Sequence, residues 1–309
     1  TGFALFTVLY LFNAATFLVD KSVHDWPASA AIAAALGFLV VGWLVYDTIC
    51  QAFGQRKNGD LIVGSCLLVF VVFASWLACQ LFAGRAAFLL VGAMLATTMS
   101  ANVFVWIIPG QRKVVAQLKA GETVDPVHGV RGKQRSVHNT YFTLPVLFAM
   151  LSNHYSFTWS HPQNWLVLIV MMLAGALIRH SFVARHKAGV LGKRAPWEFA
   201  ALGTAMLVGL AIWMAPPPPS VAAMAAAGQP ASFAQVRQVL DQRCAMCHNA
   251  QVISKNIQLH TPELLVKNAH AMYQQAVVTR IMPMSNATQI TEEERAKIGA
   301  WVMAGAKAN

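Results

Sequence analysis

Residues 61–82 read LIVGSCLLVFVVFASWLACQLF, a run that contains no charged residue and is long enough to cross a membrane. A helix of this length rises about 33 Å at 1.5 Å per residue, against about 30 Å of hydrocarbon in a bilayer. Comparable runs recur along the chain. The fifth run is the weakest, because it is short and contains Pro145. We place the runs at about 1–19, 28–50, 61–82, 86–108, 140–157, 162–184 and 197–215. The sequence predicts an all-α, polytopic transmembrane bundle of about seven helices.

The composition also indicates a membrane protein. The chain has 309 residues, of which 57% are hydrophobic and 11% are charged, whereas about 25% of the residues in soluble domains are charged. The low charged fraction of the chain as a whole therefore points to a membrane. The chain starts at Thr1 inside an apolar run, which we interpret as the start of a fragment of a longer protein.

A change of composition after Trp213 marks a second module. Four prolines at 216–219 and an Ala-rich stretch follow, and residues 231–309 are too polar for a membrane. Consecutive prolines favour an extended and fairly stiff spacer. We therefore predict a transmembrane domain at 1–215, a Pro/Ala-rich linker at 216–230 and a small domain at 231–309.

The small domain is expected to be helical. A second helix should start near Thr261 and Pro262, and the last helix at Thr291, whose following glutamates form a capping-box pattern. The first helix is predicted from apolar residues at helical spacing, which are Phe233, Val236, Val239 and Leu240.

The pentad Cys244-Ala245-Met246-Cys247-His248 follows that first helix. Two thiols at this spacing can take the two thioether bonds of a haem, and the adjacent histidine can ligate its iron. A zinc site would need a second Cys or His pair, and a redox dithiol would be expected in a βαβ pattern. Besides His248 the tail offers only His260 and His270, with no further cysteine, and no βαβ pattern is present. The sequence therefore predicts one covalent haem c bound by Cys244, Cys247 and His248.

The sixth iron ligand is expected downstream of the pentad. Met282, directly before Pro283, is favoured over Met284, which makes His248 and Met282 the predicted metal ligands. The order of pentad, Met-Pro and a final helix with Trp301 resembles a class I cytochrome c. This resemblance covers residues 231–309 only.

The topology follows from the haem, which is attached outside the cytoplasm, so residues after the seventh run should be extracytoplasmic. The loops expected outside then carry only Lys21 and Arg85. The loops expected inside carry Arg56, Lys57, Arg112, Lys113, Lys119, Arg131, Lys133, Arg135, Arg185, Lys187, Lys193 and Arg194. This asymmetry obeys the positive-inside rule. The net charge of +11 is thereby explained by membrane lipids as partners, and we expect no nucleic acid.

Polar groups within apolar runs are costly and are candidates for function. Those expected toward the inner side are Asp47, Asn102, His138, Asn139, Arg179 and His180; those toward the outer side are Asp20, His24, Asp25, Asn153, His154 and His161. A haem b between bundle histidines is possible but not favoured. His138 and His154 are about 24 Å apart along a helix and cannot share one iron. Helix capping or contact with lipid headgroups is the reading that we prefer for them.

The segment at 127–142 combines cations, imidazoles and amides at the start of the fifth run. Such a set can bind a planar, anionic heterocycle through charge-assisted hydrogen bonds. It can equally be a basic cytoplasmic loop, and the residue types alone do not choose between the two.

Three stretches of the membrane domain resemble a known family. The stretches ANVFVWIIPGQR at 101–112, GKQRSVHNTYFTLPVLF at 132–148 and SNHY at 152–155 resemble the bacterial membrane-bound urate hydroxylase (urate oxidase), a multi-spanning domain fused to a C-terminal cytochrome c. That family has further membrane sequence at its front. The resemblance implies a multi-pass protein of the bacterial inner (plasma) membrane with its cytochrome domain on the periplasmic side.

The resemblance further implies oxidation of urate to 5-hydroxyisourate. Electrons would pass to the chain's own haem c and on to a respiratory acceptor such as a soluble cytochrome c or a terminal oxidase. On this reading His138 is a base or orienter, Asn139 its hydrogen-bond partner, and Arg179 with His180 the anion contacts.

Those residues are expected on the inner side, across the membrane from the haem. Either the pocket lies on the outer side near His24 and His154, or a relay carries the electrons; the sequence leaves both open. The main alternative function is a membrane-anchored cytochrome c subunit of a respiratory complex without urate activity. A quinol-oxidising enzyme with a haem in the bundle is a second alternative.

Overall fold

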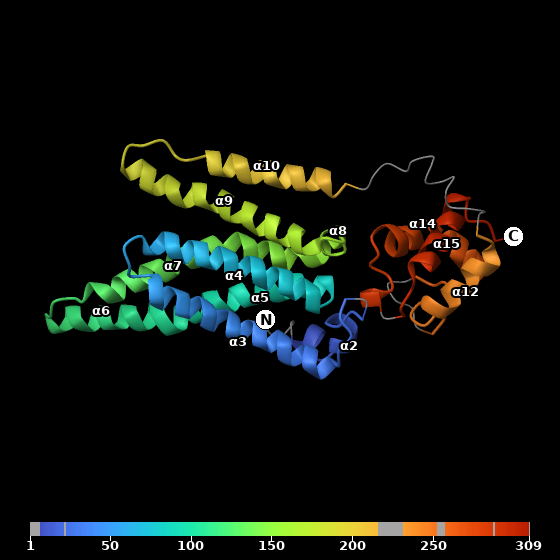
Figure 1. The fold of residues 1–309 in the computed structure, drawn as a ribbon, viewed down its shortest axis with the longest axis horizontal. Coiled ribbons are helices and arrows are strands. Elements are labelled where there is room, and N and C mark those ends of the chain that lie inside the picture. Colours follow the sequence, from blue (N-terminus) through green and yellow to red (C-terminus); the bar gives the residue numbers. More distant parts are fainter. Residues whose placement is uncertain (1–6, 22, 216–230, 252–256, 287, 309) are drawn as a thin grey trace. The chain divides into compact units, whose positions relative to one another are not determined.

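The structure, a computed structural model, describes residues 7–21, 23–215, 231–251, 257–286 and 288–308. Every regular element among these residues is a helix (Figure 1), so the prediction of an all-α protein is confirmed. The chain divides into two compact units, one of them Ala28–Met214 and the other Thr1–Pro27 together with Ala215–Asn309. The predicted linker at 216–230 lies outside the described residues.

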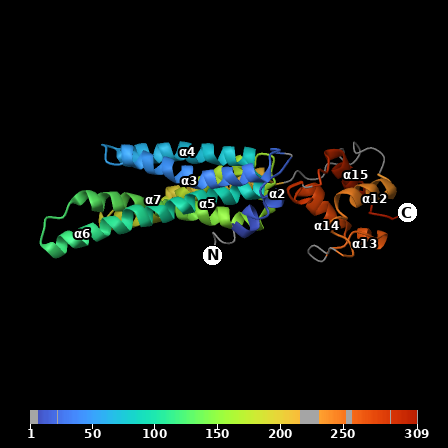
Figure 2. The ribbon, with the colours of Figure 1, turned by 90° about the horizontal axis from the view of Figure 1, so that it is seen from below.

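The unit Ala28–Met214 is a bundle of helices that run alongside one another (Figures 1 and 2). Its elements are α3 (Ala28–Phe53), α4 (Gly59–Leu81), α5 (Gly84–Ala101), η2 (Asn102–Ile107), α6 (Ile108–Ala120), α7 (Pro126–Leu151), η3 (Ser152–His154), α8 (Ser156–Trp159), α9 (Asn164–Val190) and α10 (Glu198–Trp213). The α5 helix packs on α3, α4 and α7, and α9 packs on α7 and α10. The α6 helix lies along α7.

Four stretches are long and apolar enough to cross a membrane. They are α3, α4, the continuous helical stretch Gly84–Ala120 and α9, and they correspond to the runs expected at 28–50, 61–82, 86–108 and 162–184. The third stretch continues past residue 108 as α6. A helical bundle with membrane-spanning capacity is thus shown for four of the seven expected spans.

The other three expected spans differ from the prediction. The fifth lies within α7, which starts at Pro126, where Asp125 caps the helix by accepting a hydrogen bond from the Val127 amide. Because the first half of α7 is polar, this helix is not among the four stretches that are apolar enough to cross a membrane. The seventh, α10, is apolar but shorter. The first expected span, at 1–19, is described only from residue 7 onward. There the chain forms two short helices, η1 (Thr7–Leu11) and α2 (Ala14–Phe17), instead of one long helix.

Small residues allow the bundle helices to pack closely. A Cβ atom on Gly92 of α5 would meet the Cβ of Ala149 of α7 at 2.5 Å. A Cβ atom on Gly203 of α10 would lie 2.8 Å from the Ala174 carbonyl oxygen of α9. Small residues at such crossings are typical of helix packing in membranes, where close van der Waals contact replaces the hydrophobic effect.

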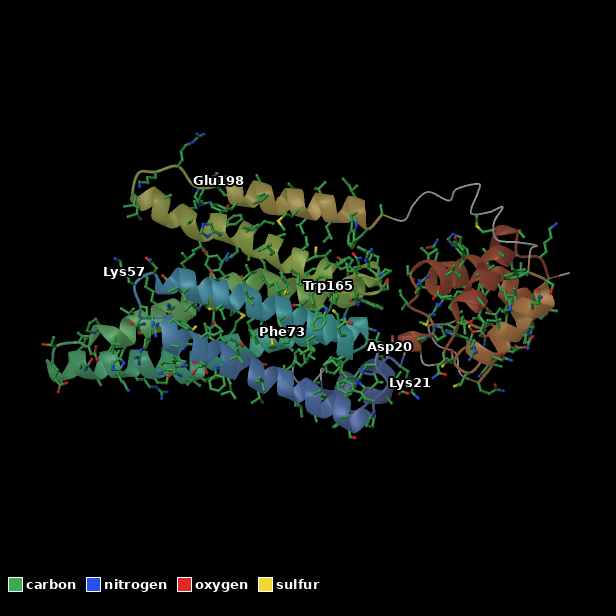
Figure 3. All side chains as sticks on the ribbon, viewed as in Figure 1. Asp20, Lys21, Lys57, Phe73, Trp165 and Glu198 are labelled. Atoms are coloured by element: carbon green, nitrogen blue, oxygen red, sulfur yellow. The ribbon has the colours of Figure 1, made fainter. Side chains whose placement is uncertain are left out.

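Large apolar side chains cover the outer surface of the bundle. Phe73 and Trp76 on α4 are 55% and 42% exposed, and Phe73 and Trp165 are labelled on α4 and at the start of α9 in Figure 3. Lys57, in the turn after α3, and Glu198, at the start of α10, lie toward one end of the bundle (Figure 3). An apolar belt with charged residues at its end is the pattern that lipid requires.

The described C-terminal residues form a small helical core. Its elements are α12 (Phe233–Arg243), α13 (Pro262–Lys267), α14 (Ala269–Met272), η5 (Tyr273–Val278), η6 (Met284–Asn286) and α15 (Glu292–Met303). The predicted helix starts at Thr261 and Thr291 are confirmed, since each side chain accepts a hydrogen bond from the first turn. Core residues include Val236, Leu240, Leu265, Ile298 and Trp301.

Candidate functional site

A buried ion pair joins α3 to α7. Arg135 Nη2 lies 2.8 Å from Asp47 Oδ1, and the two side chains are only 4% and 12% exposed. Trp106 Nε1 of η2 donates to the same oxygen at 2.7 Å. The guanidinium also lies over the rings of Trp106 and Tyr46, 5.1 and 5.0 Å from their centroids. The cation is therefore held by a carboxylate and two aromatic faces.

Amide groups extend this cluster. Asn102 Nδ2 donates to Tyr46 Oη and to Asn139 Oδ1, both at 2.9 Å. Asn139 Nδ2 donates to the Met99 carbonyl oxygen at 3.0 Å. Tyr46 Oη in turn lies 2.9 Å from His138 Nδ1. One hydrogen-bonded network thus connects α3, η2 and α7.

The network borders a cavity of about 900 Å³. His138 belongs both to the network and to the cavity wall. The polar wall residues come from the α3–α4 turn, the start of α4 and α7; they include Arg56, Asn58, Asp60, Lys133, Gln134, His138 and Tyr141. The remaining wall is apolar and comes from α4, α5, α7 and α9, including Leu67, Val71, Leu95, Ile169 and Met172. The cavity is therefore amphipathic, which suits a flat organic ligand with a polar edge.

The structure brings some of the predicted site residues together and separates others. His138 and Asn139 share the network. His180 of α9 is linked to α7 by a 2.7 Å hydrogen bond between its Nδ1 and Tyr141 Oη. Arg179 Nε is buried without a hydrogen-bond partner among the described residues. His154 is exposed in η3, beyond the C-terminal end of α7.

A different pair of groups occupies that far end of α7. Arg85 Nε, at the start of α5, donates to Asn153 Oδ1 at 2.8 Å. Trp159 Nε1 donates to the Ser152 carbonyl oxygen at 3.1 Å. These bonds join the helix ends to each other, and His154 is not among their partners. Of the expected outer cluster, Asn153 is therefore placed in a helix-end contact, whereas Asp20, His24 and Asp25 belong to the other compact unit.

Sequence reasoning missed Tyr46 and Trp106, which complete the network. Tyrosine and tryptophan in an apolar run read as ordinary apolar residues, so neither carried a signal of its own. The available signal was Asp47, because a carboxylate inside a membrane run requires a partner of opposite charge. Arg135 had been counted only as a loop cation.

The pentad occupies the turn after α12. The His248 amide donates to the Cys244 carbonyl oxygen at 3.1 Å, and His248 Nδ1 lies 3.0 Å from the Ile257 carbonyl oxygen. A carbonyl only accepts, so Nδ1 carries the hydrogen and Nε2 is left for another partner. Burial raises the pKa of the Cys244 thiol to about 11, whereas Cys247 is exposed.

Met282 has its backbone held at both ends. Its amide donates to the Gln275 carbonyl oxygen, and its own carbonyl accepts from Arg295 Nη1, both at 2.9 Å. Arg295 also donates to the Ala276 carbonyl oxygen. Burial lowers the pKa of Arg295, and the nearby Glu292 opposes this effect. Within the described ranges, no group of three or more His, Cys, Asp or Glu side chains is placed to hold a bare metal ion.

A helical bundle with helices long enough to span a membrane, a buried ion pair and an amphipathic cavity defines a helical protein with membrane-spanning capacity and a cavity between its helices. The chain belongs to the urate oxidase N-terminal family, which matches residues 1–215. This membership supports a urate-related oxidase function. No curated protein and no solved structure matches the chain. The expected urate oxidase resemblance is thereby confirmed at the level of the family, and the fused cytochrome c stays a prediction.

Proposed function

We propose that the protein is a membrane-bound urate hydroxylase, which oxidises urate to 5-hydroxyisourate and passes the electrons to a haem c in its own C-terminal domain. The family match over residues 1–215 supports the substrate class. The observation that carries the proposal is the polar end of the cavity, where His138 joins the buried network to the wall.

Urate is a planar anion at neutral pH with hydrogen-bonding groups around its edge. Arg56 and Lys133 line the cavity, and neither forms an ion pair with a described residue. Such cations attract an anion and can make charge-assisted hydrogen bonds to it. The apolar wall from α4, α7 and α9 would cover the ring faces and exclude water from them.

The individual roles follow from this placement. His138 is the base or orienter, and Asn139 supports it through the shared network. Neither Arg179 nor His180 of α9 is among the residues that line the cavity, and His180 is linked to its wall through the hydrogen bond to Tyr141. Their role as anion contacts is therefore the one that the resemblance implies, and the cavity wall adds no support to it. His154 would serve only a second pocket at the far end of α7. We place the substrate at the cavity end that contains His138.

Cys244 and Cys247 would hold the haem through thioether bonds, and His248 Nε2 and the Met282 sulfur are the groups that would ligate its iron. When bound, the haem supplies a one-electron acceptor. His248 fits this role because its Nδ1 is hydrogen-bonded to the Ile257 carbonyl oxygen, a contact that orients the imidazole and leaves Nε2 for the iron. Met282 fits because its backbone is fixed on both sides. The thiol of Cys244 packs against the apolar core.

Oxidation of the urate monoanion by water to 5-hydroxyisourate releases two electrons and one proton. The bundle residues have three tasks, which are to hold the anion, to admit one water molecule and to take up the proton. The electrons leave to a respiratory acceptor such as a soluble cytochrome c or a terminal oxidase. We place the haem domain on the extracytoplasmic side of a bacterial inner membrane.

The test is urate-dependent reduction of the haem in purified membranes, followed by its visible spectrum. Addition of urate without another reductant should reduce the haem and form 5-hydroxyisourate in proportion. A haem that stays oxidised with urate but is reduced by a quinol or another cytochrome refutes the hydroxylase. That result would favour the membrane-anchored cytochrome subunit instead.

Two alanine variants then locate the pocket. His138→Ala should lower the rate of urate-dependent reduction by about tenfold or more while haem incorporation and reduction by dithionite stay normal. His154→Ala should leave the reduction rate within about twofold of the unmodified protein, since an exposed group far from the cavity contributes little. The opposite pattern would place the pocket at the outer end of α7.

A further inference from the structure

The amides of Asn102 and Asn139 have one orientation that satisfies their neighbours. The Met99 carbonyl oxygen only accepts, so Asn139 donates to it through Nδ2. Its Oδ1 then accepts from Asn102 Nδ2. At the other end Arg135 only donates, so Asn102 faces it with Oδ1, 3.4 Å from Nη1. These two ends fix the direction of every hydrogen bond in the chain of amides.

The direction carries over to Tyr46. Its Oη accepts a hydrogen from Asn102 Nδ2, so its own hydrogen goes to one of the remaining neighbours. His138 Nδ1 lies 2.9 Å away. The sulfur of Cys50, one turn further along α3, lies 3.8 Å from the same nitrogen, and a thiol is a weak hydrogen-bonding partner as donor and as acceptor. The tyrosine O–H therefore bonds to His138 Nδ1.

We infer that neutral His138 carries its hydrogen on Nε2 and offers it to the cavity as a hydrogen-bond donor to the bound anion, with Tyr46 as the positioning residue that fixes this tautomer. His138 lines the cavity, and Nε2 is the ring nitrogen that the network leaves free. An Nε2–H group donates and does not accept a proton. The inference rests on the proposed function, since the anion is urate, and it assigns His138 the orienting role instead of that of the base.

The proton released from water then needs another acceptor in the cavity. Among the described residues of the wall, Asp60 is the carboxylate. Gln134 Nε2 donates to Asp60 Oδ1 at 2.9 Å, and Gln134 precedes His138 by about one helical turn on the same wall. Asp60 takes up this proton as the water oxygen bonds to the urate ring and two electrons leave to the haem acceptor proposed above.

The tautomer is tested directly by nitrogen-15 NMR of the full-length haem protein in lipid bilayers, with only histidine labelled. The His138 signals are identified by their loss in His138→Gln. At neutral pH, Nε2 should show the protonated and Nδ1 the unprotonated shift. Tyr46→Phe should remove this single tautomer, whereas the matched variant Cys50→Ala should keep it. Protonated Nδ1, a doubly protonated ring, or a tautomer that responds to Cys50 and not to Tyr46 overturns the inference.

Kinetics test the roles separately. His138→Gln retains an N–H donor and should keep kcat/KM within about tenfold, whereas His138→Leu should lose on the order of tenfold to hundredfold, the usual range for a hydrogen bond to a charged group. Asp60→Asn should lower kcat with little change in KM. Equal loss in the Gln and Leu variants, or unchanged kcat in Asp60→Asn, overturns the assignment. If the unmodified protein does not oxidise urate, the proposed function is refuted, but the His138 tautomer can still be measured by NMR.

Discussion

Asp47→Asn removes one charge of the buried pair while keeping the size and most hydrogen-bonding capacity of the side chain. The Arg135 guanidinium, 4% exposed, then lies in the bundle without its carboxylate at 2.8 Å. Breaking a buried ion pair at one partner typically costs about 3–5 kcal/mol, because the remaining charge is uncompensated. We expect the free energy of unfolding to fall by that amount.

The bundle contains its own reporters for this measurement. Cys50 and Cys79 are buried in α3 and α4, so a thiol-reactive dye should label them only when the helices separate. Labelling is followed across an equilibrium titration with a denaturing detergent. Asp241→Asn is the control, because it removes a carboxylate from an ion pair that is 30% and 48% exposed and should change stability by less than about 1 kcal/mol.

The double variant Asp47→Leu/Arg135→Met completes the experiment. Replacing both members of a buried pair by apolar residues is often neutral or stabilising. Its unfolding free energy should therefore exceed that of Asp47→Asn. A loss below about 1 kcal/mol in Asp47→Asn, or a double variant no more stable than the single one, would refute the argument that the pair is buried and mutually dependent.

Three further predictions concern other parts of the chain. Replacing both Cys244 and Cys247 by serine should abolish covalent haem, so that denaturing gels stained for haem and mass spectra of the chain show no attached haem; a persistent adduct would contradict the assignment. Burial would raise the pKa of Glu294, but hydrogen bonds from Arg243 and Thr291 outweigh this effect and hold the pKa below its usual value of 4.5. The stabilisation from ionised Glu294 is therefore present above pH 4.5 and is lost as the pH falls further. Acid unfolding of the C-terminal unit, followed by Trp301 fluorescence, should be less steep in Glu294→Gln than in the unmodified protein. Gly92→Ala should destabilise the bundle by about 1–3 kcal/mol through a clash with Ala149. Gly37→Ala is the control and should be neutral or slightly stabilising, because the added methyl group has open space around it. The thiol-reactive dye assay measures both variants.

Prediction from the sequence succeeded where a signal is local. The starts of α13 and α15 were predicted correctly, because a threonine cap and the residues one turn later are sufficient to define a helix end. The start of α7 was not predicted. Asp125 and Pro126 form an equally local start signal, but the polar residues that follow favoured a loop between two spans.

The candidate site was predicted only in part, for a different reason. His138 and Asn139 were named because polar groups at the edge of an apolar run are costly. Their partners are 92 residues away for Tyr46 and 37 for Asn102. No local pattern states which faces of α3, η2 and α7 meet.

The sequence alone was enough to show that the protein is helical and that several of its helices can span a membrane. It also showed that a pentad with haem-binding spacing lies in the polar part of the chain after Trp213. These properties depend on runs and spacings within short stretches of chain. That Asp47 pairs with Arg135, and that His138 Nδ1 lies 2.9 Å from Tyr46 Oη, could be learned only from the tertiary structure. The physical reason is that the rotation and crossing of each helix set which side chains meet, and these arise from packing over the whole bundle.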